Sequence, residues 1–123
     1  RDFVRNQTYA AGVDTADTDC IIQAVDEAAT NIILHGYRGN RGVIEIEVIL
    51  LPDRIIVILR DNAPIFDPTQ VPVPDINLPL EQRPVGGLGV HLIRKCVDEF
   101  THTKSSRGGN ELLLVKYLHK EDY

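Results

Sequence analysis

The hydrophobic positions of the 123-residue chain change their period along its length, and each change predicts a new element. Asp2 to Gly12 predicts a short helix that ends at a glycine. A second helix is predicted up to His35, because apolar side chains recur there at helical spacing and share one broad face. Its candidate N-caps are Asp14, Thr15, Asp17 and Thr18. Its predicted core residues are Ile21, Ile22, Val25, Ala28, Ala29, Ile32 and Ile33.

Strand patterns follow the second helix. Val43 to Leu51 alternates apolar and charged side chains, so we expect one side of this strand to be buried and the other to be wet. Arg54 to Arg60 is apolar at every position between its two arginines, which predicts an interior strand covered on both faces. Gly87 to Val97 then predicts a helix, and residues 99–104 and 111–118 predict two more strands.

Residues 61–86 separate these two halves and show no periodicity. Six of the seven prolines lie in this segment, and a loop of this length is usually a functional lid or a linker. Neighbouring strands without a helix between them predict antiparallel pairs. We therefore expect residues 1–123 to form one α+β domain, a two-layer α/β sandwich with a mostly antiparallel mixed sheet and its helices on one face.

Composition narrows the function classes. Hydrophobic residues make up 43% of the chain and charged residues 25%, which is typical of a soluble globular domain rather than of a disordered one. The formal charge of −5 argues against broad contact with a nucleic-acid backbone. The longest apolar run, Ile55 to Leu59, is far shorter than the ~20 residues that span a bilayer.

Two further compositional features bear on the chain. Cys20 and Cys96 lie in apolar contexts without metal-ligand spacing, so we expect buried free thiols. Methionine is absent, even at position 1, so we expect the chain to be a piece of a longer protein.

Glu27 and Asn31 are the first candidates for chemistry. Their i, i+4 spacing places a carboxylate and a carboxamide side by side on one helix face. Such a pair suits a Mg²⁺ ion with its water, or a base that takes a proton from a hydroxyl while the amide holds the metal. The alternative is a solvated helix face.

Asp61 and two glycine-rich segments are the other candidates. Asp61 ends an apolar strand, where a carboxylate can accept a hydrogen bond from an exocyclic amine such as that of adenine, or can start an Asx turn. The run Gly86-Gly87-Leu88-Gly89-Val90 opens a helix, where backbone N–H groups attract phosphate. It lacks the dinucleotide fingerprint and the Walker A lysine. The run Arg107-Gly108-Gly109-Asn110 is most simply a hairpin turn.

In the order and setting of these segments, the chain resembles the GHKL ATPase/kinase family, and within it the anti-sigma-factor serine kinases. The segments that carry the resemblance are 26–37, 60–68, 86–93 and 108–112. The most specific is the E-A-x-T-N-x-x-x-H-G-Y stretch that begins at Glu27. The resemblance covers about residues 14–118. The opening strand of the family is expected ahead of Arg1.

The resemblance implies a role for each matched position. Glu27 would be the general base that activates a substrate serine, Asn31 would hold Mg²⁺, and Asp61 would accept a hydrogen bond from the adenine amino group. Residues 61–86 would form an ATP lid. The remaining positions implied in ATP binding are Ala63, Gly86, Gly87, Leu88, Gly89 and Val90, with the glycines letting backbone N–H groups reach the phosphates.

The implied function is a cytoplasmic serine/threonine protein kinase of a partner-switching system. It would phosphorylate a STAS-type anti-sigma-factor antagonist and would bind a sigma factor when that antagonist is absent. We expect no direct contact with nucleic acid or membrane. The resemblance also allows a homodimer. One alternative is a non-catalytic module of the same fold that sequesters a partner. A weaker one is the catalytic piece of a histidine kinase. The presence of both Glu27 and Asn31 favours the enzyme.

Two positions depart from the family pattern. The family usually has glycine two residues after the adenine-binding aspartate, and this chain has Ala63, whose methyl group would crowd the nucleotide or stiffen the loop. The last glycine segment often continues with threonine, and here it continues with Asn110.

Overall fold

The computed structural model describes residues 2–10, 12–70, 87–105 and 108–118. Most of the lid that the sequence predicts, residues 71–86, lies outside these ranges, so the lid remains a prediction. The helices are α1 (Asp2–Ala10), α2 (Thr15–Asn31) and α3 (Gly87–Cys96), with a π-helical turn η1 (Ile32–Gly36) and a 3₁₀ turn η2 (Pro68–Gln70). The strands are β1 (Ile44–Leu50), β2 (Arg54–Asp61), β3 (Glu99–Lys104) and β4 (Asn110–Tyr117).

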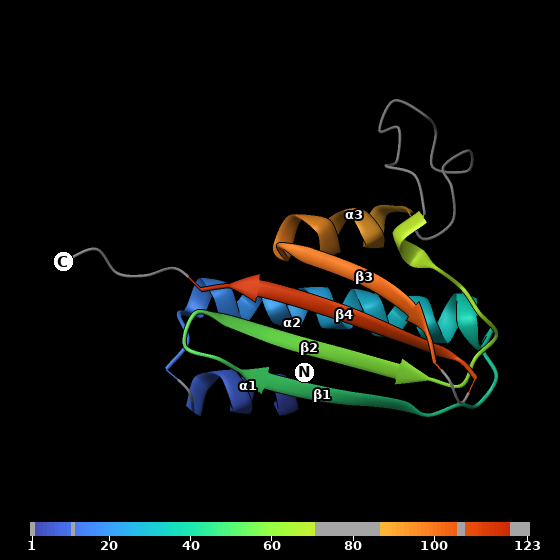
Figure 1. Ribbon diagram of the computed structural model, residues 1–123, viewed down its shortest axis with the longest axis horizontal. Helices are drawn as coiled ribbons and strands as arrows, with labels where there is room; N and C mark the ends of the chain where they lie inside the picture. The colour runs from blue at the N-terminus through green and yellow to red at the C-terminus, as the bar shows by residue number, and fades with distance from the viewer. Residues whose placement is uncertain (1, 11, 71–86, 106–107, 119–123) are drawn as a thin grey trace.

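In the described part of the chain, the strands form one sheet in the order β1-β2-β4-β3, and every pair is antiparallel. The helices pack on one face of this sheet: α1 contacts β1, α2 contacts β2, and α3 contacts β3 and α2 (Figure 1). This arrangement confirms the α+β two-layer sandwich that the sequence predicts.

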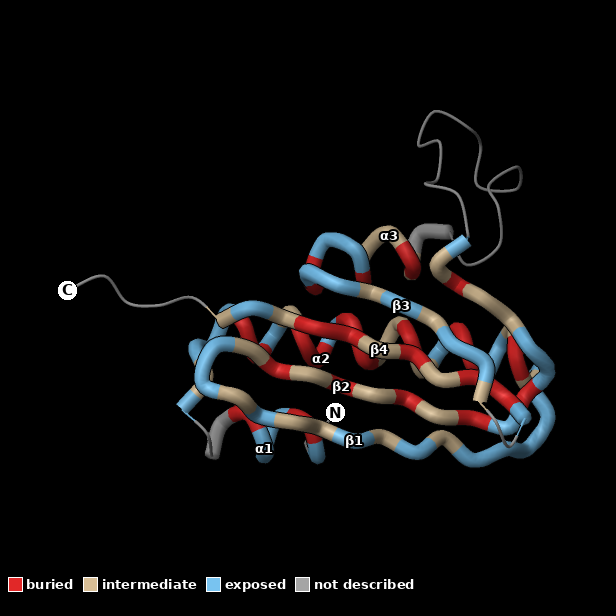
Figure 2. The backbone as a smooth tube through the Cα atoms, viewed as in Figure 1, coloured by how far each residue is buried: buried red, intermediate tan, exposed pale blue. Residues whose placement is uncertain are grey.

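The core lies between α2 and the inner face of β2 and β4. Ile55, Val57 and Leu59 are fully buried there and alternate with half-buried residues, as the colours along β2 in Figure 2 show. The prediction that β2 is covered on both faces is wrong. Its outward residues Ile56 and Ile58 are only half-buried, because among the described residues the helices lie on a single face.

The second helix begins at a predicted N-cap but ends differently from a plain α-helix of the predicted length. Asp14 is its N-cap, and the Asp14 carboxylate accepts a hydrogen bond of 2.7 Å from the backbone N–H of Ala16. At its other end the chain continues as the π-helical turn η1, closed by a 2.8 Å hydrogen bond from Tyr37 N–H to the carbonyl of Ile32. The wider turn shifts the helical phase, and Ile33, predicted to lie in the core, is 47% exposed.

The cysteines follow the sequence prediction in part. Both are free; Cys96 is buried as expected, whereas Cys20 is half-buried. Burial raises the pKa of the Cys96 thiol to about 11, so this thiol stays protonated at neutral pH. Within the ranges that the structure describes, none of the helices combines the length and the apolar character that crossing a membrane requires.

Leu59 provides a test of the packing between the sheet and α2. It is fully buried on the inner face of β2, so Leu59→Ala should lower the free energy of unfolding by about 2–5 kcal/mol. Urea unfolding followed by circular dichroism measures this loss. The control Glu45→Ala changes an exposed residue of β1 and should stay within about 0.5 kcal/mol of the parent chain. A similar loss in both variants would contradict this account of the core.

Candidate functional site

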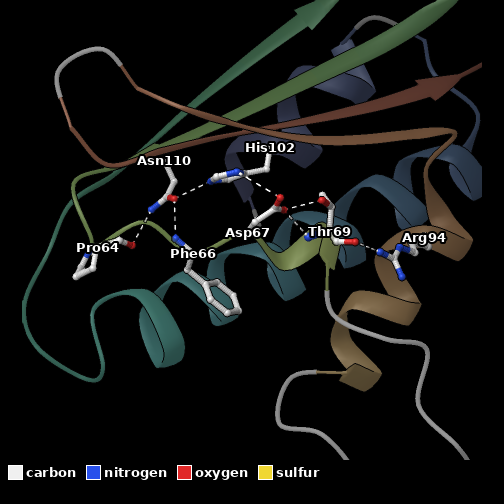
Figure 3. A network of polar contacts seen from close by, with 7 residues as sticks. All are labelled: Pro64, Phe66, Asp67, Thr69, Arg94, His102 and Asn110. Carbon is white, nitrogen blue, oxygen red and sulfur yellow. Dashed lines mark hydrogen bonds and ion pairs between the residues drawn. The ribbon is translucent and has the colours of Figure 1, made fainter.

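The end of β2 and the start of β4 carry two buried polar side chains. Asp61 and Asn110 are paired across the sheet and are only 5% and 3% exposed. Asn110 Nδ2 donates hydrogen bonds to Asp61 Oδ1 at 2.9 Å and to the carbonyl of Pro64 at 3.1 Å, and the Pro64 contact is drawn in Figure 3. A buried amide therefore fixes the carboxylate at the carboxyl end of β2.

The two oxygens of Asp61 have different roles. Oδ1 also accepts a 2.9 Å hydrogen bond from the backbone N–H of Ala63, which is the Asx turn that the sequence allowed. No described residue donates a hydrogen bond to Oδ2. Among the residues that the structure describes, the Asx turn therefore uses one oxygen of Asp61 and leaves the other without a donor.

The hairpin that precedes β4 packs directly against the backbone of Asp61. A β-carbon on Gly109 would lie 1.9 Å from the carbonyl oxygen of Asp61, closer than any real contact. Gly109 also has a φ of 88°, in the left-handed region that favours glycine. This position therefore requires glycine for both its conformation and its close approach to β2.

Asn31 lies at the end of α2 and is 5% exposed. The alternative of a solvated helix face is therefore wrong for this residue. Glu27, one turn earlier, is half-buried. No described residue accepts a hydrogen bond from Asn31 Nδ2. An unpaired amide inside a protein is costly, so its presence points to a ligand or to water at this position.

The start of α3 faces both of these side chains. A β-carbon on Gly89 would lie 2.8 Å from Glu27 Oε2 and 3.8 Å from Asn31 Nδ2. The carboxylate and the amide therefore converge on the glycine-rich first turn of α3, where backbone N–H groups are free of helical partners.

A small cavity joins the α2 and β2 parts of the site. Its accessible volume of about 10 Å³ is the space of roughly one water molecule. A purine base is much larger than this cavity. The residues that line it are Asn31, Ile32, Gly36, Asp61, Phe66, Pro68, Asn110 and Leu112.

The Asn31 amide at the end of α2 could serve as one ligand of a magnesium ion. The oxygen and nitrogen of the Asn31 amide exchange places by a half-turn of the side chain, so either can face the cavity. In the part of the chain that the structure describes, no group of three or more His, Cys, Asp or Glu residues could hold a metal. A Mg²⁺ ion here would take the remaining ligands from phosphates and water, as this ion commonly does.

Other positions implied by the resemblance are placed as follows. Ala63 is buried, and a β-carbon on Gly36 would lie 3.0 Å from its methyl group, so this methyl packs against η1. The side chain of Val90 is buried, which leaves only its backbone for a ligand. Gly86 and the side chain of Leu88 lie outside the described residues, and Gly87 begins α3.

Tyr37 is a residue of the site whose role the sequence analysis missed. Its hydroxyl donates to the carbonyl of Val43 at 2.7 Å and accepts a 2.9 Å hydrogen bond from the backbone N–H of Asn62. It therefore ties η1 to the residue that follows Asp61. Its place beside His35 and Gly36 in the most specific motif was the available signal.

Comparison with known proteins identifies the family of this chain. The model of a family described as "histidine kinase-like ATPase domain" matches residues 1–116. A serine-protein kinase RsbW of Bacillus cereus strain B4264 is 35% identical over 102 residues, which cover 80% of this chain and 62% of the relative. RsbW of B. cereus strain AH187 is 34% identical over 122 residues, which cover 96% of this chain and 73% of the relative. The chain thus spans about three fifths to three quarters of the length of these two relatives.

Substitution of two adjacent glycines tests the close approach of Gly109 to the backbone of Asp61. Gly108 and Gly109 both have positive φ, but a β-carbon on Gly108 would meet nothing within 4 Å. Gly108→Ala should cost about 1–2 kcal/mol of unfolding free energy from backbone strain alone. Gly109→Ala should cost that amount and a further ~1–3 kcal/mol from crowding against Asp61. Equal losses in chemical denaturation would mean that the close approach is unimportant.

Proposed function

The chain belongs to the histidine kinase-like ATPase family and is homologous to the serine-protein kinase RsbW, and from this premise we propose that it is an ATP-dependent serine/threonine protein kinase. The observation that supports catalysis is the convergence of Glu27 and Asn31 on Gly89. Family membership supports ATP as the nucleotide. The activity and the residue roles below are our proposal.

Asp61 and the first turn of α3 would bind the two ends of ATP. The free oxygen Oδ2 of Asp61 would accept a hydrogen bond from the adenine amino group, while Oδ1 stays engaged with Ala63 and Asn110. Backbone N–H groups from Gly87 to Gly89 would donate to phosphate oxygens, helped by the positive end of the helix dipole. Gly86, Leu88 and Val90 remain proposed neighbours of the phosphates.

Asn31 would hold Mg²⁺ through its amide oxygen. When bound, the ion would neutralise phosphate charge and help to align the transferred group, which is the main requirement of phosphoryl transfer. The Asn31 amide is already buried and unpartnered among the described residues, at a cost of about 1–3 kcal/mol. A protein that only sequesters a partner has no need of that arrangement, and this favours the enzyme over the non-catalytic module.

Glu27 would act as the general base. Its carboxylate lies beside the start of α3, where the terminal phosphate would be bound, so it can take the proton of an incoming serine hydroxyl as the oxygen attacks phosphorus. Its partial exposure leaves the carboxylate accessible to a protein substrate.

For the partner, we propose a STAS-type anti-sigma-factor antagonist as substrate and a sigma factor as the alternative binding partner. The support is the RsbW homology together with the E-A-x-T-N-x-x-x-H-G-Y motif that begins at Glu27. Incubation of the chain with Mg·ATP labelled in the γ-phosphate and candidate STAS proteins tests this directly. Label on a serine supports the kinase; stable binding without label would support the sequestering module instead.

Substitution of Asp61 tests the adenine contact. A hydrogen bond to a charged acceptor is worth about 1.5–3 kcal/mol, so Asp61→Asn should weaken ATP binding by roughly ten- to a hundredfold. The preference for ATP over GTP should fall as well, because an amide can also donate to the carbonyl oxygen of guanine. Calorimetry of both nucleotides measures these effects. Unchanged ATP affinity would remove Asp61 from the site.

Substitution of Glu27 and Asn31 separates catalysis from nucleotide binding. Glu27→Gln retains the shape of the side chain and should reduce phosphotransfer by roughly 10²–10⁴ while ATP binds almost normally. Asn31→Ala should also weaken Mg²⁺-dependent ATP binding, because the ion loses a ligand. Single-turnover labelling and calorimetry distinguish the two failures, with Glu45→Gln as the control at an exposed carboxylate. Full activity of Glu27→Gln would exclude its role as base.

A further inference from the structure

A buried histidine of β3 contacts the amide that holds Asp61. The side chain of His102 is 5% exposed, and its Nε2 lies 2.7 Å from Asn110 Oδ1 (Figure 3). His102 sits on the inner face of the sheet, opposite Leu112 of β4. The proposed reaction does not use this histidine, although it is two contacts away from the proposed adenine acceptor.

The neighbours of Asn110 determine which way its amide points. The backbone N–H of Phe66 donates to Asn110 Oδ1 at 3.0 Å, so this end of the amide must be the oxygen. The other end faces Asp61 Oδ1 and the carbonyl of Pro64, both acceptors, so it must be the nitrogen. His102 Nε2 therefore carries a proton and donates to Oδ1, which fills the second acceptor position of the amide.

The other side of the imidazole faces the segment that follows β2. His102 Nδ1 lies 3.8 Å from Asp67 Oδ2, while Asp67 Oδ1 accepts hydrogen bonds from Thr69 N–H at 2.9 Å and from Thr69 Oγ1 at 2.6 Å. The carbonyl of Thr69 in turn accepts a hydrogen bond from Arg94 of α3. His102 thus lies in the middle of a network, and Figure 3 shows its part from Pro64, which follows β2, to Arg94 of α3.

We propose that His102 is a positioning residue that makes the nucleotide site select adenine. It does so by donating a second hydrogen bond to Asn110 Oδ1, which holds the amide firmly in the place where it engages Asp61 Oδ1 and leaves Asp61 Oδ2 for the base. This inference rests on the proposed function, because it assumes that Asp61 receives the adenine amino group.

The chemistry of the two purines explains the selectivity. Adenine presents an amino donor where guanine presents a carbonyl acceptor, so a fixed carboxylate attracts one and repels the other. Without the His102 donor, Asn110 Oδ1 keeps only its hydrogen bond from Phe66, so the amide retains its orientation but is held less tightly and can shift. An amide that shifts no longer keeps the Asp61 carboxylate in place, and a mobile carboxylate repels a guanine carbonyl less strongly.

Three substitutions in β3 test the proposal. His102→Leu removes the donor. His102→Gln restores an N–H near the position of Nε2, and Thr103→Val changes an exposed residue on the outer face of the same strand. Calorimetry with Mg·ATP and Mg·GTP should show ATP binding weakened about 3- to 10-fold by His102→Leu, with GTP binding unchanged or improved. His102→Gln should stay within about twofold of the parent affinity, as should Thr103→Val.

A measurement without nucleotide isolates the network itself. Hydrogen exchange at the Phe66 amide should speed up in His102→Leu and stay slow in His102→Gln, because Asn110 Oδ1 holds that N–H. If His102→Leu does not fold, His102→Asn replaces it, since its shorter amide does not reach the position of Nε2.

The outcomes separate this inference from the proposed function. If the parent chain binds ATP but His102→Leu weakens ATP and GTP equally, the proposal is overturned and His102 is only structural. Failure of His102→Gln to restore the ratio of affinities also overturns it. If the parent chain binds neither nucleotide, the proposed function itself fails, and slow exchange at Phe66 then shows that the network alone is correct.

Discussion

The side-chain amide of Asn110 is the contact on which the candidate site depends. Its nitrogen donates to Asp61 and Pro64, and its oxygen accepts from Phe66 and His102, so both ends are fully used. These partners come from two segments, residues 61–66 and strand β3, and the first is more than 40 positions from Asn110. An apolar side chain here would leave at least one of these buried polar groups unpaired, at a cost of about 1–3 kcal/mol.

The site is assembled from the ends of regular elements, while their middles form the core. β2 ends at Asp61, α2 ends at Asn31 and α3 begins at Gly87, and each end brings backbone or side-chain groups that lack partners within its own element. The apolar middles, with Leu59 as an example, hold these ends in fixed relation. Because of this separation, the polar side chains of the site lie next to the apolar core without interrupting its packing.

The sequence predicted the elements well because their periods are local properties, and every described helix and strand lies close to its predicted place. It also pointed to Asp61 and Asn31 as members of one site through the order of the motifs. It failed where distant segments decide the outcome. The burial of Asn31, the single covered face of β2 and the Asn110 network all depend on partners that no local spacing reveals; Asn110 and Asp61 are 49 positions apart.

The π-helical turn at Ile32–Gly36 also limits how the length of this chain can vary. The turn places Gly36 against Ala63 and brings the hydroxyl of Tyr37 to Asn62. Loss of one residue from this turn would restore ordinary α-helical phase and rotate Gly36 and Tyr37 by about 100° around the helix axis. Homologous chains that keep both contacts should therefore tolerate substitutions within the turn but not insertions or deletions.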